Sequence, residues 1–243
     1  MQETGNNIII PDIKRLTIQL DLSGFSFKIL SESDEIIDSG SHTIPSSSNN
    51  ILDFMQDIQG IIYSYPSLID TNVFDTKLYF RSEKYALVPK EYFCEENIVE
   101  DLNKIHNVKD SEQVMFCQAS IDNIIIVYAI PKDIINTFRN IFEHIEFFPN
   151  AYLLLEDTDK IADSNYINLD QGSNLMDVAV FEQKKLKLIN SFPASDFTTL
   201  LYFMIMITKE VVFNPQLTTV KVGSSISEDT IQKLSTYYKK VIR

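Results

Sequence analysis

Two short polar turns, far apart in the sequence, carry the residues best suited to chemistry. Asp21-Leu22-Ser23-Gly24 and Asp170-Gln171-Gly172-Ser173 each place an acid at the end of an apolar, alternating segment and follow it with small residues. An aspartate in such a turn can accept hydrogen bonds from the N–H groups of the turn, or it can offer carboxylate oxygens to a cation. Glycine lets other groups approach the backbone closely. The residue types leave both interpretations open.

Each turn belongs to a longer unit, and the two units are similar. Residues 16–45 and 166–193 each contain three segments with the period-two alternation of half-buried strands, separated by short polar turns. The acid lies 24 residues before the proline that closes the first unit and 23 residues before the proline that closes the second. We therefore expect a structural duplication, with strand meanders followed by helices in an α/β architecture.

The rest of the chain supplies further strands and helices. Apolar residues at helical spacing predict helices that bury one face, and alternating or short β-branched runs predict strands. Ser46–Ser48 offer hydroxyl groups for the N-cap of the first helix. The expected helices are at 51–62, 91–105, 131–145, 195–207 and 226–241, and the expected further strands are at 73–88 (two), 113–119, 123–130, 147–155 and 217–222.

The opening segment LTIQLDLSGFSFKIL, the segment ALVPKEYF and the paired meanders resemble an uncharacterised Bacteroidetes protein family of unknown function. That family has actin-like ATPase architecture and is similar to the pilus- and division-type members. The resemblance implies an α/β fold of duplicated ribonuclease H-like halves, with an inserted α+β subdomain in the first half. We expect a loose tail at 1–12, a first half at 13–156 with the insertion at about 78–150, and a second half at 157–243.

The resemblance also assigns roles to the polar turns. In actin-like ATPases two Asp-x-Gly turns hold the ATP phosphates through backbone N–H groups, and their carboxylates hold Mg²⁺ through water. The residues that correspond to the nucleotide site are Asp21, Ser23, Gly24, Asp170, Gly172, Ser173 and Gly223, and Asp21 and Asp170 correspond to the metal site. Two departures stand out, because Ser23 replaces an expected glycine and Gly223 stands where many members have two glycines.

These departures favour a non-catalytic function over an enzymatic one. No acid suited to activating water is recognisable in the connecting segments, so no catalytic residue is predicted. We expect a degenerate nucleotide-binding protein, or pseudo-ATPase, that serves as a scaffold or assembly adaptor, with ATP and Mg²⁺ as the implied cofactors. The alternative is an active Mg-ATP-dependent ATPase or phosphotransferase that uses Asp21 and Asp170. A two-metal nuclease is a third interpretation, but it needs several convergent carboxylates of which only Asp21 can be assigned.

Charge and composition limit the partners. The net charge of −13 argues against nucleic acid, because phosphate binding needs a basic surface. The charge is uneven, since residues 1–181 carry 12 basic and 29 acidic residues and residues 182–243 carry 9 basic and 5 acidic residues. We expect a protein partner that the sequence does not identify, and a homodimer is compatible with it.

Other features point to an ordinary cytoplasmic protein. The N-terminus lacks the pattern of a signal peptide, and two cysteines, Cys94 and Cys117, form no disulfide framework or zinc motif. The three histidines have no metal-ligand spacing. The apolar run Leu200–Ile207 is too short to span a bilayer and predicts a buried helix without a transmembrane segment.

Overall fold

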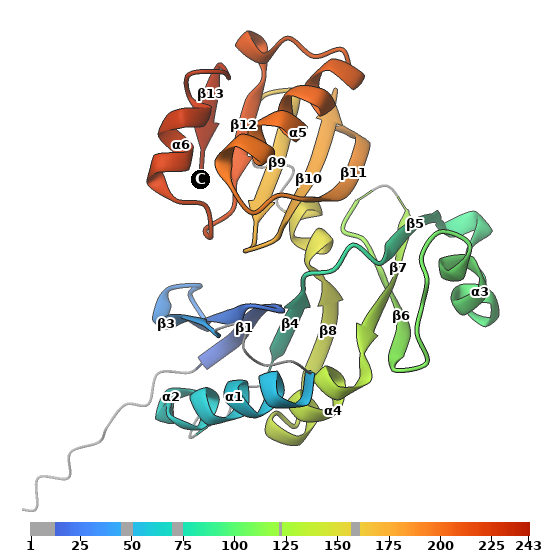
Figure 1. The fold of residues 1–243 in the computed structure, drawn as a ribbon, viewed down its shortest axis with the longest axis vertical. Coiled ribbons are helices and arrows are strands. Elements are labelled where there is room, and N and C mark those ends of the chain that lie inside the picture. The colour runs from blue at the N-terminus through green and yellow to red at the C-terminus, as the bar shows by residue number, and fades with distance from the viewer. Residues whose placement is uncertain (1–12, 45–50, 70–74, 122, 157–160) are drawn as a thin grey trace, which may run out of the picture.

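The chain forms two five-stranded sheets with the same strand order (Figure 1). The structure is a computed structural model that describes residues 13–44, 51–69, 75–121, 123–156 and 161–243. The first sheet has the order β3-β2-β1-β4-β8, and the second has the order β11-β10-β9-β12-β13. The strands are β1 Ile13–Asp21, β2 Gly24–Ser31, β3 Ile36–Thr43, β4 Thr76–Phe80, β8 Ile145–Pro149, β9 Tyr166–Gln171, β10 Leu175–Glu182, β11 Lys185–Pro193, β12 Thr219–Val222 and β13 Lys240–Ile242.

The pairing directions repeat as well as the order. Strand β1 is antiparallel to β2 and parallel to β4, and β9 is antiparallel to β10 and parallel to β12. Both meanders expected from the sequence are therefore confirmed, together with the duplication of α/β halves. Because the first strand of each sheet is central, Asp21 and Asp170 both lie at the carboxyl end of a central strand.

Helices cover one face of each sheet because their apolar residues recur at helical spacing. In the first half, α1 (Ile51–Tyr63) buries Phe54, Met55, Ile58 and Ile62 and packs against α4 (Lys132–Ile141). A short helix, α2 (Pro66–Ile69), follows α1. The expected N-cap serines 46–48 lie outside the described residues.

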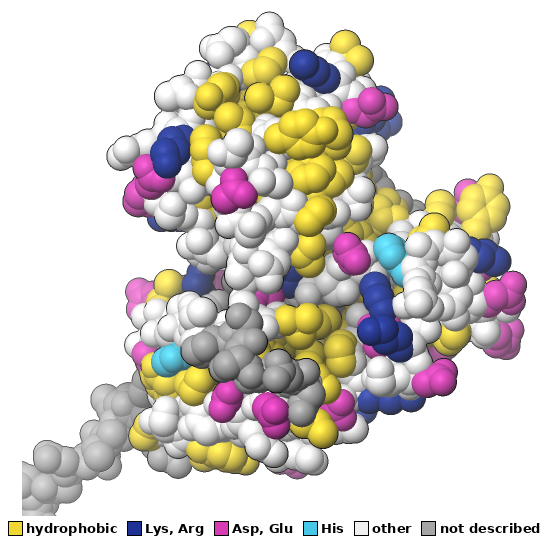
Figure 2. Space-filling model, viewed as in Figure 1, with side chains coloured by type: hydrophobic (Ala, Val, Ile, Leu, Met, Phe, Trp, Pro, Cys, Tyr) yellow, Lys and Arg dark blue, Asp and Glu magenta, His cyan; other side chains and the backbone are white. Residues whose placement is uncertain are grey.

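In the second half the main helix is α5 (Phe197–Glu210), which begins at the N-cap Asp196. The Asp196 carboxylate accepts a hydrogen bond from the Thr199 N–H at 3.0 Å. Only one face of this apolar helix is buried, because Tyr202, Ile205 and Met206 remain exposed, and Figure 2 shows hydrophobic side chains gathered over α5. The prediction of a buried helix is thus confirmed for one face alone. The described part of the chain has no helix with the length and hydrophobicity needed to cross a membrane.

The inserted subdomain is a three-stranded sheet with a small helical segment. Its strands are β5 Tyr85–Pro89, β6 Glu112–Gln118 and β7 Ile124–Pro131, in the order β5-β7-β6. The expected hairpin is confirmed, with Asn123 at a positive φ of 51° in its turn. The expected helix at 91–105 is wrong, because two short 3₁₀ turns and the six-residue α3 (Ile98–Asn103) replace it. Leu102 is the one buried residue of α3, so the segment lacks the apolar face that a longer helix needs.

Two further expectations are corrected at the ends of the halves. The expected strand at 147–155 ends with β8, and a 3₁₀ helix, η3 (Asn150–Leu155), continues toward the second half. The expected closing helix at 226–241 is short, since α6 spans Glu228–Leu234 and the chain then forms β13. Strand β13 pairs in parallel with β12, and this pairing of β-branched Val241 and Ile242 outweighs continued helix. The exact limits of the halves and of the insertion stay a prediction.

Candidate functional site

The two acidic turns meet between the halves. The Asp21 carboxylate accepts hydrogen bonds from the N–H of Ser23 at 2.8 Å and from the N–H and hydroxyl of Ser173 at 3.4 and 3.2 Å. The hydroxyl groups of Ser23 and Ser173 also contact each other. Asp21 therefore caps its own turn and holds the turn of the other half at the same time.

An arginine joins the halves beside this contact. Arg81 follows β4 of the first half, and its guanidinium donates to Asp170 and to Asp177 of the second half, each at 2.6 Å. The arginine is 8% exposed, and the two aspartates are 4% and 1% exposed. The guanidinium is therefore a buried cation that bridges two buried carboxylates.

The register of the second meander explains why a cation is needed there. Asp170 on β9 and Asp177 on β10 are directly opposite each other. Like charges at facing positions destabilise a sheet unless a counter-charge lies between them. Asn150, which begins η3, adds hydrogen bonds to both carboxylates at 3.2 and 2.7 Å. The buried cluster thus satisfies its polar groups from both halves.

Electrostatics and hydrogen bonds set the protonation of this cluster. Burial alone would raise the pKa of Asp170, but Arg81 and the hydrogen bonds from Ser225 and Asn150 hold that pKa below its usual value. For Asp177, burial outweighs these attractions and raises the pKa. Burial would lower the pKa of Arg81, but the two aspartates raise it above its usual value. Asp170 and Arg81 are consequently charged at neutral pH.

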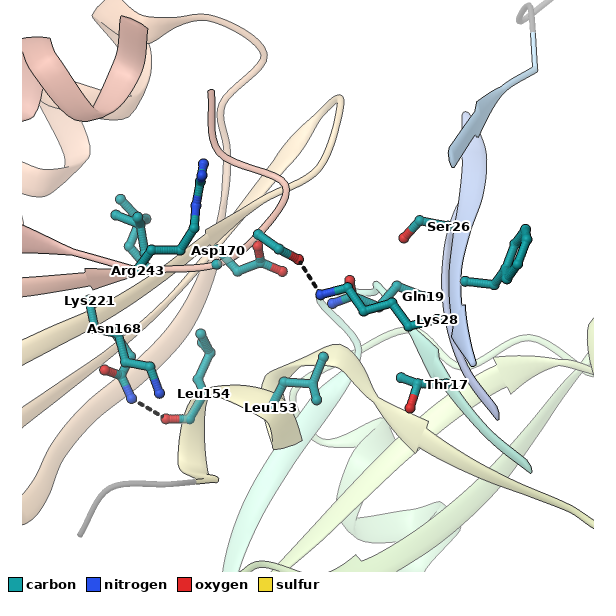
Figure 3. Close-up of a pocket in the computed structure, with 15 residues that line it drawn as sticks. Thr17, Gln19, Ser26, Lys28, Leu153, Leu154, Asn168, Asp170, Lys221 and Arg243 are labelled. Atoms are coloured by element: carbon teal, nitrogen blue, oxygen red, sulfur yellow. Dashed lines mark hydrogen bonds between the residues drawn. The ribbon is translucent and has the colours of Figure 1, made fainter. Parts of the chain in front are cut away.

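Two cavities lie along the cleft beside this cluster. One, of about 420 Å³, is lined by both acidic turns and by Arg81. The other, of about 310 Å³, is lined by Asp170, Leu153 and Leu154 and by the basic residues Lys28, Lys221 and Arg243. Lys28 extends from the first half toward the second (Figure 3), and its Nζ atom donates to the Ser224 hydroxyl oxygen at 3.3 Å. The cavities offer an anionic ligand several positive groups and an apolar wall.

One residue that lines the second cavity, Asn168, has a buried polar atom without a partner among the described residues. Asn168, which is 3% exposed, donates from its side-chain amide to the Leu154 carbonyl at 2.7 Å (Figure 3). Its Oδ1 atom is buried and accepts no hydrogen bond from the described residues.

Comparison with known proteins identifies the family. The sequence matches a family described as "Protein of unknown function (DUF3822)" over residues 3–241. The chain belongs to the DUF3822 family. A search of curated proteins found no significant match.

Solved structures that resemble this DUF3822 protein share one fold. A protein with actin-like ATPase fold and unknown function from Bacteroides thetaiotaomicron is 18% identical, with a TM-score of 0.77 over 94% of this chain and 89% of that chain. The PilM-PilN type IV pilus biogenesis complex contains a chain that is 11% identical, with a TM-score of 0.60 over 96% and 89%. The ethanolamine utilization protein EutJ from Carboxydothermus hydrogenoformans is 10% identical, with a TM-score of 0.51 over 96% and 84%. These similarities show the actin-like ATPase fold.

The nucleotide-site residues expected from the sequence come together in this DUF3822 protein. Asp21, Ser23, Gly24, Gly172 and Ser173 line the larger cavity, and Asp170 and Gly223 line the smaller one. Their assignment to nucleotide binding stays a prediction.

The two glycines of the second half make room for side chains. A methyl group at Gly172 would lie 2.6 Å from Asp21 Oδ2 and 2.7 Å from Arg81 Nε, and one at Gly223 would collide with the Asp170 carboxylate. Gly172 does not have a positive φ, so turn conformation does not explain it. Both glycines are instead required for the close approach of charged groups.

The carboxylates expected to hold Mg²⁺ are engaged by protein donors. Asp170 Oδ2 accepts from Arg81 and Asn150, and Asp170 Oδ1 accepts from Ser225 at 2.5 Å. Both oxygens of Asp21 are likewise hydrogen-bonded. Among the described residues no group of three or more His, Cys, Asp or Glu side chains is arranged to hold a metal. This arrangement does not fit Mg²⁺ unless protein donors move away.

Sequence reasoning missed Arg81, Asn150 and Asp177, although one signal was present. Asp177 is a charged residue between apolar neighbours in strand β10, and folding the predicted hairpin about Gly172-Ser173 places it opposite Asp170. Two facing buried acids require a cation. The identity of that cation was not readable, because Arg81 is 89 residues from Asp170 in the sequence.

Proposed function

We propose that this protein is a non-catalytic scaffold or assembly adaptor with an actin-like fold. In it the Arg81 guanidinium, rather than Mg²⁺, is the cation that neutralises the carboxylates between the halves. The observation that carries the proposal is the pair of 2.6 Å contacts from Arg81 to Asp170 and Asp177. An Mg²⁺ ion needs oxygen ligands that are available to it or to its bound waters. Here the carboxylate that the resemblance assigns to the metal already has a buried counter-charge.

The energetics of burial support this proposal. Separating a buried ion pair so that one partner loses its counter-charge costs about 3–5 kcal/mol. Binding Mg²⁺ at Asp170 would repel or displace Arg81, which would then keep Asp177 as its one carboxylate partner in a buried site. The hydroxyl groups of Ser23 and Ser173 also contact each other, so a phosphate could pass directly between these two side chains only if the contact broke.

The same cleft supports weak, metal-independent binding of an anion. Lys28, Lys221 and Arg243 line the cavity of about 310 Å³. Any nucleotide in this protein would place its phosphates near these cations, and its affinity would not depend on Mg²⁺.

A protein-binding role is supported by a neighbour of the same fold. The PilM-PilN type IV pilus biogenesis complex contains a chain of similar fold bound to another protein. We propose that this chain likewise acts by holding a protein partner, with the two halves as a fixed unit.

The alternative is an active ATPase or phosphotransferase that uses Asp21 and Asp170. One observation favours it, because the lowered pKa keeps Asp170 ionised and this residue lines a cavity beside Lys28. In this interpretation the halves must separate to release Asp170 from Arg81.

Two measurements distinguish the proposals. The first is isothermal titration of the protein with ATP in the presence of Mg²⁺ and in the presence of EDTA. The second is phosphate release by the wild type and by Asp170→Ala, with Lys233→Ala on α6 as an exposed control. The scaffold proposal expects equal, background-level phosphate release from all three proteins. A wild-type rate that is above background and lost in Asp170→Ala alone would establish the enzyme.

A further inference from the structure

Two edge strands from different sheets face each other outside the cleft. Strand β11 is the edge of the second sheet, and strand β5 is the edge of the inserted sheet (Figure 1). A groove of about 530 Å³ lies between them and is lined by Ala86 and Leu87 of β5 and by residues 186–190 of β11. We call it the β5–β11 groove.

The open edge of β11 has peptide groups available for pairing. The N–H of Ala194 donates to the Asn174 carbonyl, which shows that the even-numbered residues of β11 share backbone hydrogen bonds with β10. Ile189 is odd-numbered, so its peptide groups are not bonded to β10. The N–H and C=O of Ile189 therefore point away from β10, and Ile189 itself lines the groove. Among the described residues β11 pairs with β10 alone.

The edge of β5 has fewer peptide groups available for pairing than the edge of β11. The N–H of Tyr85 donates to the Glu83 carbonyl, and Pro89 has no N–H. The Lys84 carbonyl accepts from the Ala129 N–H, and the Lys90 N–H donates to the Asn123 carbonyl. In this register the peptide groups of even-numbered residues point toward β7, so those of Leu87 lie on the open side. An added strand would consequently pair along β11 and pack against β5.

The groove has an apolar floor and a basic end. Leu186, Leu188 and Ile189 are half-buried. Leu186, Ile189 and Leu87 pack against a core cluster that contains residues of both halves, and Leu188 packs against the core of the second half. Lys184, Lys185 and Lys187 are exposed at the start of β11. Glu182 pairs with Lys187 at 2.8 Å and supplies one negative charge against these three positive ones.

The duplication provides an internal comparison. Strand β3 is the corresponding edge of the first sheet, and its central residues Asp38, Ser39 and Ser41 are polar. An apolar and basic edge is therefore not required by the fold. Lysine on an edge strand discourages pairing with identical, basic edges and attracts acidic ones.

We infer that the β5–β11 groove binds an extended protein segment that alternates apolar and acidic residues and adds as a strand along β11. The open peptide group of Ile189 supplies main-chain pairing, the half-buried leucines receive the apolar side chains, and the lysines face the acidic ones. This surface lies apart from the cleft with Arg81. It gives the proposed scaffold a binding surface, and its test does not use the cleft, so either proposal can fail without the other.

The test uses a fluorescein-labelled eight-residue peptide that alternates valine and glutamate, measured by fluorescence anisotropy against the full chain at low salt. Saturable binding is expected for this peptide. The same peptide with an N-methyl group on every residue keeps its side chains and charges but has no N–H donor left on either strand edge, so its binding is expected to be lost. A valine–lysine peptide is expected not to bind.

The matched protein variants separate the groove from general charge. Lys185→Glu with Lys187→Glu reverses two exposed charges at the groove and is expected to weaken binding by about tenfold at low ionic strength. The control with Lys209→Glu and Lys233→Glu makes the same change in net charge on α5 and α6 and is expected to leave affinity unchanged. Circular dichroism confirms that both variants are folded.

Three outcomes would overturn the inference. They are no saturation at millimolar peptide, equal binding of the N-methylated peptide, and equal weakening by both charge variants. Analytical ultracentrifugation of the wild type tests the alternative that a second copy of this chain occupies the groove. A dimer that dissociates in a Leu188→Glu variant and excludes the peptide would assign the groove to self-association instead.

Discussion

Replacing Arg81 with methionine tests the central contact of the cleft. Methionine fills much of the arginine's volume but removes its charge, so Asp170 and Asp177 would lie opposite each other, buried and without a cation. Loss of one partner from a buried ion pair costs about 3–5 kcal/mol. We expect the free energy of unfolding at pH 7 to fall by this amount.

Urea denaturation followed by circular dichroism measures the change. With a slope of about 2–3 kcal/mol per molar urea, the midpoint should fall by roughly 1–2.5 M. The double variant Arg81→Met with Asp177→Asn removes one of the two buried charges that have lost their cation, and it should lose less stability than Arg81→Met alone. This coupling is the specific signature of the ion pair, because independent sites would give additive losses.

A second signature comes from pH. In Arg81→Met the two buried acids have folded-state pKa values above their unfolded values, so stability is present at low pH and is lost as pH rises through those raised values. The variant should therefore recover stability relative to the wild type as pH falls toward 5. A loss below about 1 kcal/mol at pH 7, the usual range for an exposed ion pair, would refute the reasoning.

Two further predictions concern residues around the cation. The pKa of Asp170 is lowered in the folded state, so its charge stabilises the protein above the unfolded pKa, and this contribution is lost as pH falls through the folded pKa. The loss of unfolding free energy in Asp170→Asn relative to wild type should therefore be largest near pH 7 and shrink below about pH 4 in urea titrations. In thermal melts, Gly172→Ala should lower the free energy of unfolding by about 1–3 kcal/mol, because its methyl group would collide with Asp21 and Arg81. The control Gly60→Ala in α1, where the methyl group meets nothing within 4 Å, should raise it by about 0.5–1 kcal/mol.

The sequence was most informative where structure is local. The alternation in residues 16–45 and 166–193 predicted both meanders, because a strand exposes its period of two within a few residues. The repeated spacing to proline then predicted the duplication, which the common strand order confirms. Helix α1 was predicted for the same reason, from a periodic apolar face.

The sequence was least informative where a distant partner decides. Strand β13 has three residues, too few for a periodic pattern, and it exists because β12 offers an edge beside it. The acidic segment at 91–105 has helix-forming residues, but it lacks the buried face that would hold a long helix. The cation that pairs with Asp170 comes from the opposite half, so no local sequence pattern predicts that it is Arg81.

The contacts between the halves bear on whether the cleft can work by opening and closing. Arg81 binds Asp177, which is 1% exposed, so separating the halves would break a buried ion pair at both ends. The Asp21–Ser173 and Lys28–Ser224 hydrogen bonds would break with it. A dissociable metal ion can leave and return during a cycle, but an arginine is fixed to its chain and stays charged. A cleft closed by such a residue stabilises one arrangement of the halves, and a fixed arrangement supports the proposal of a scaffold rather than of a nucleotide-driven machine.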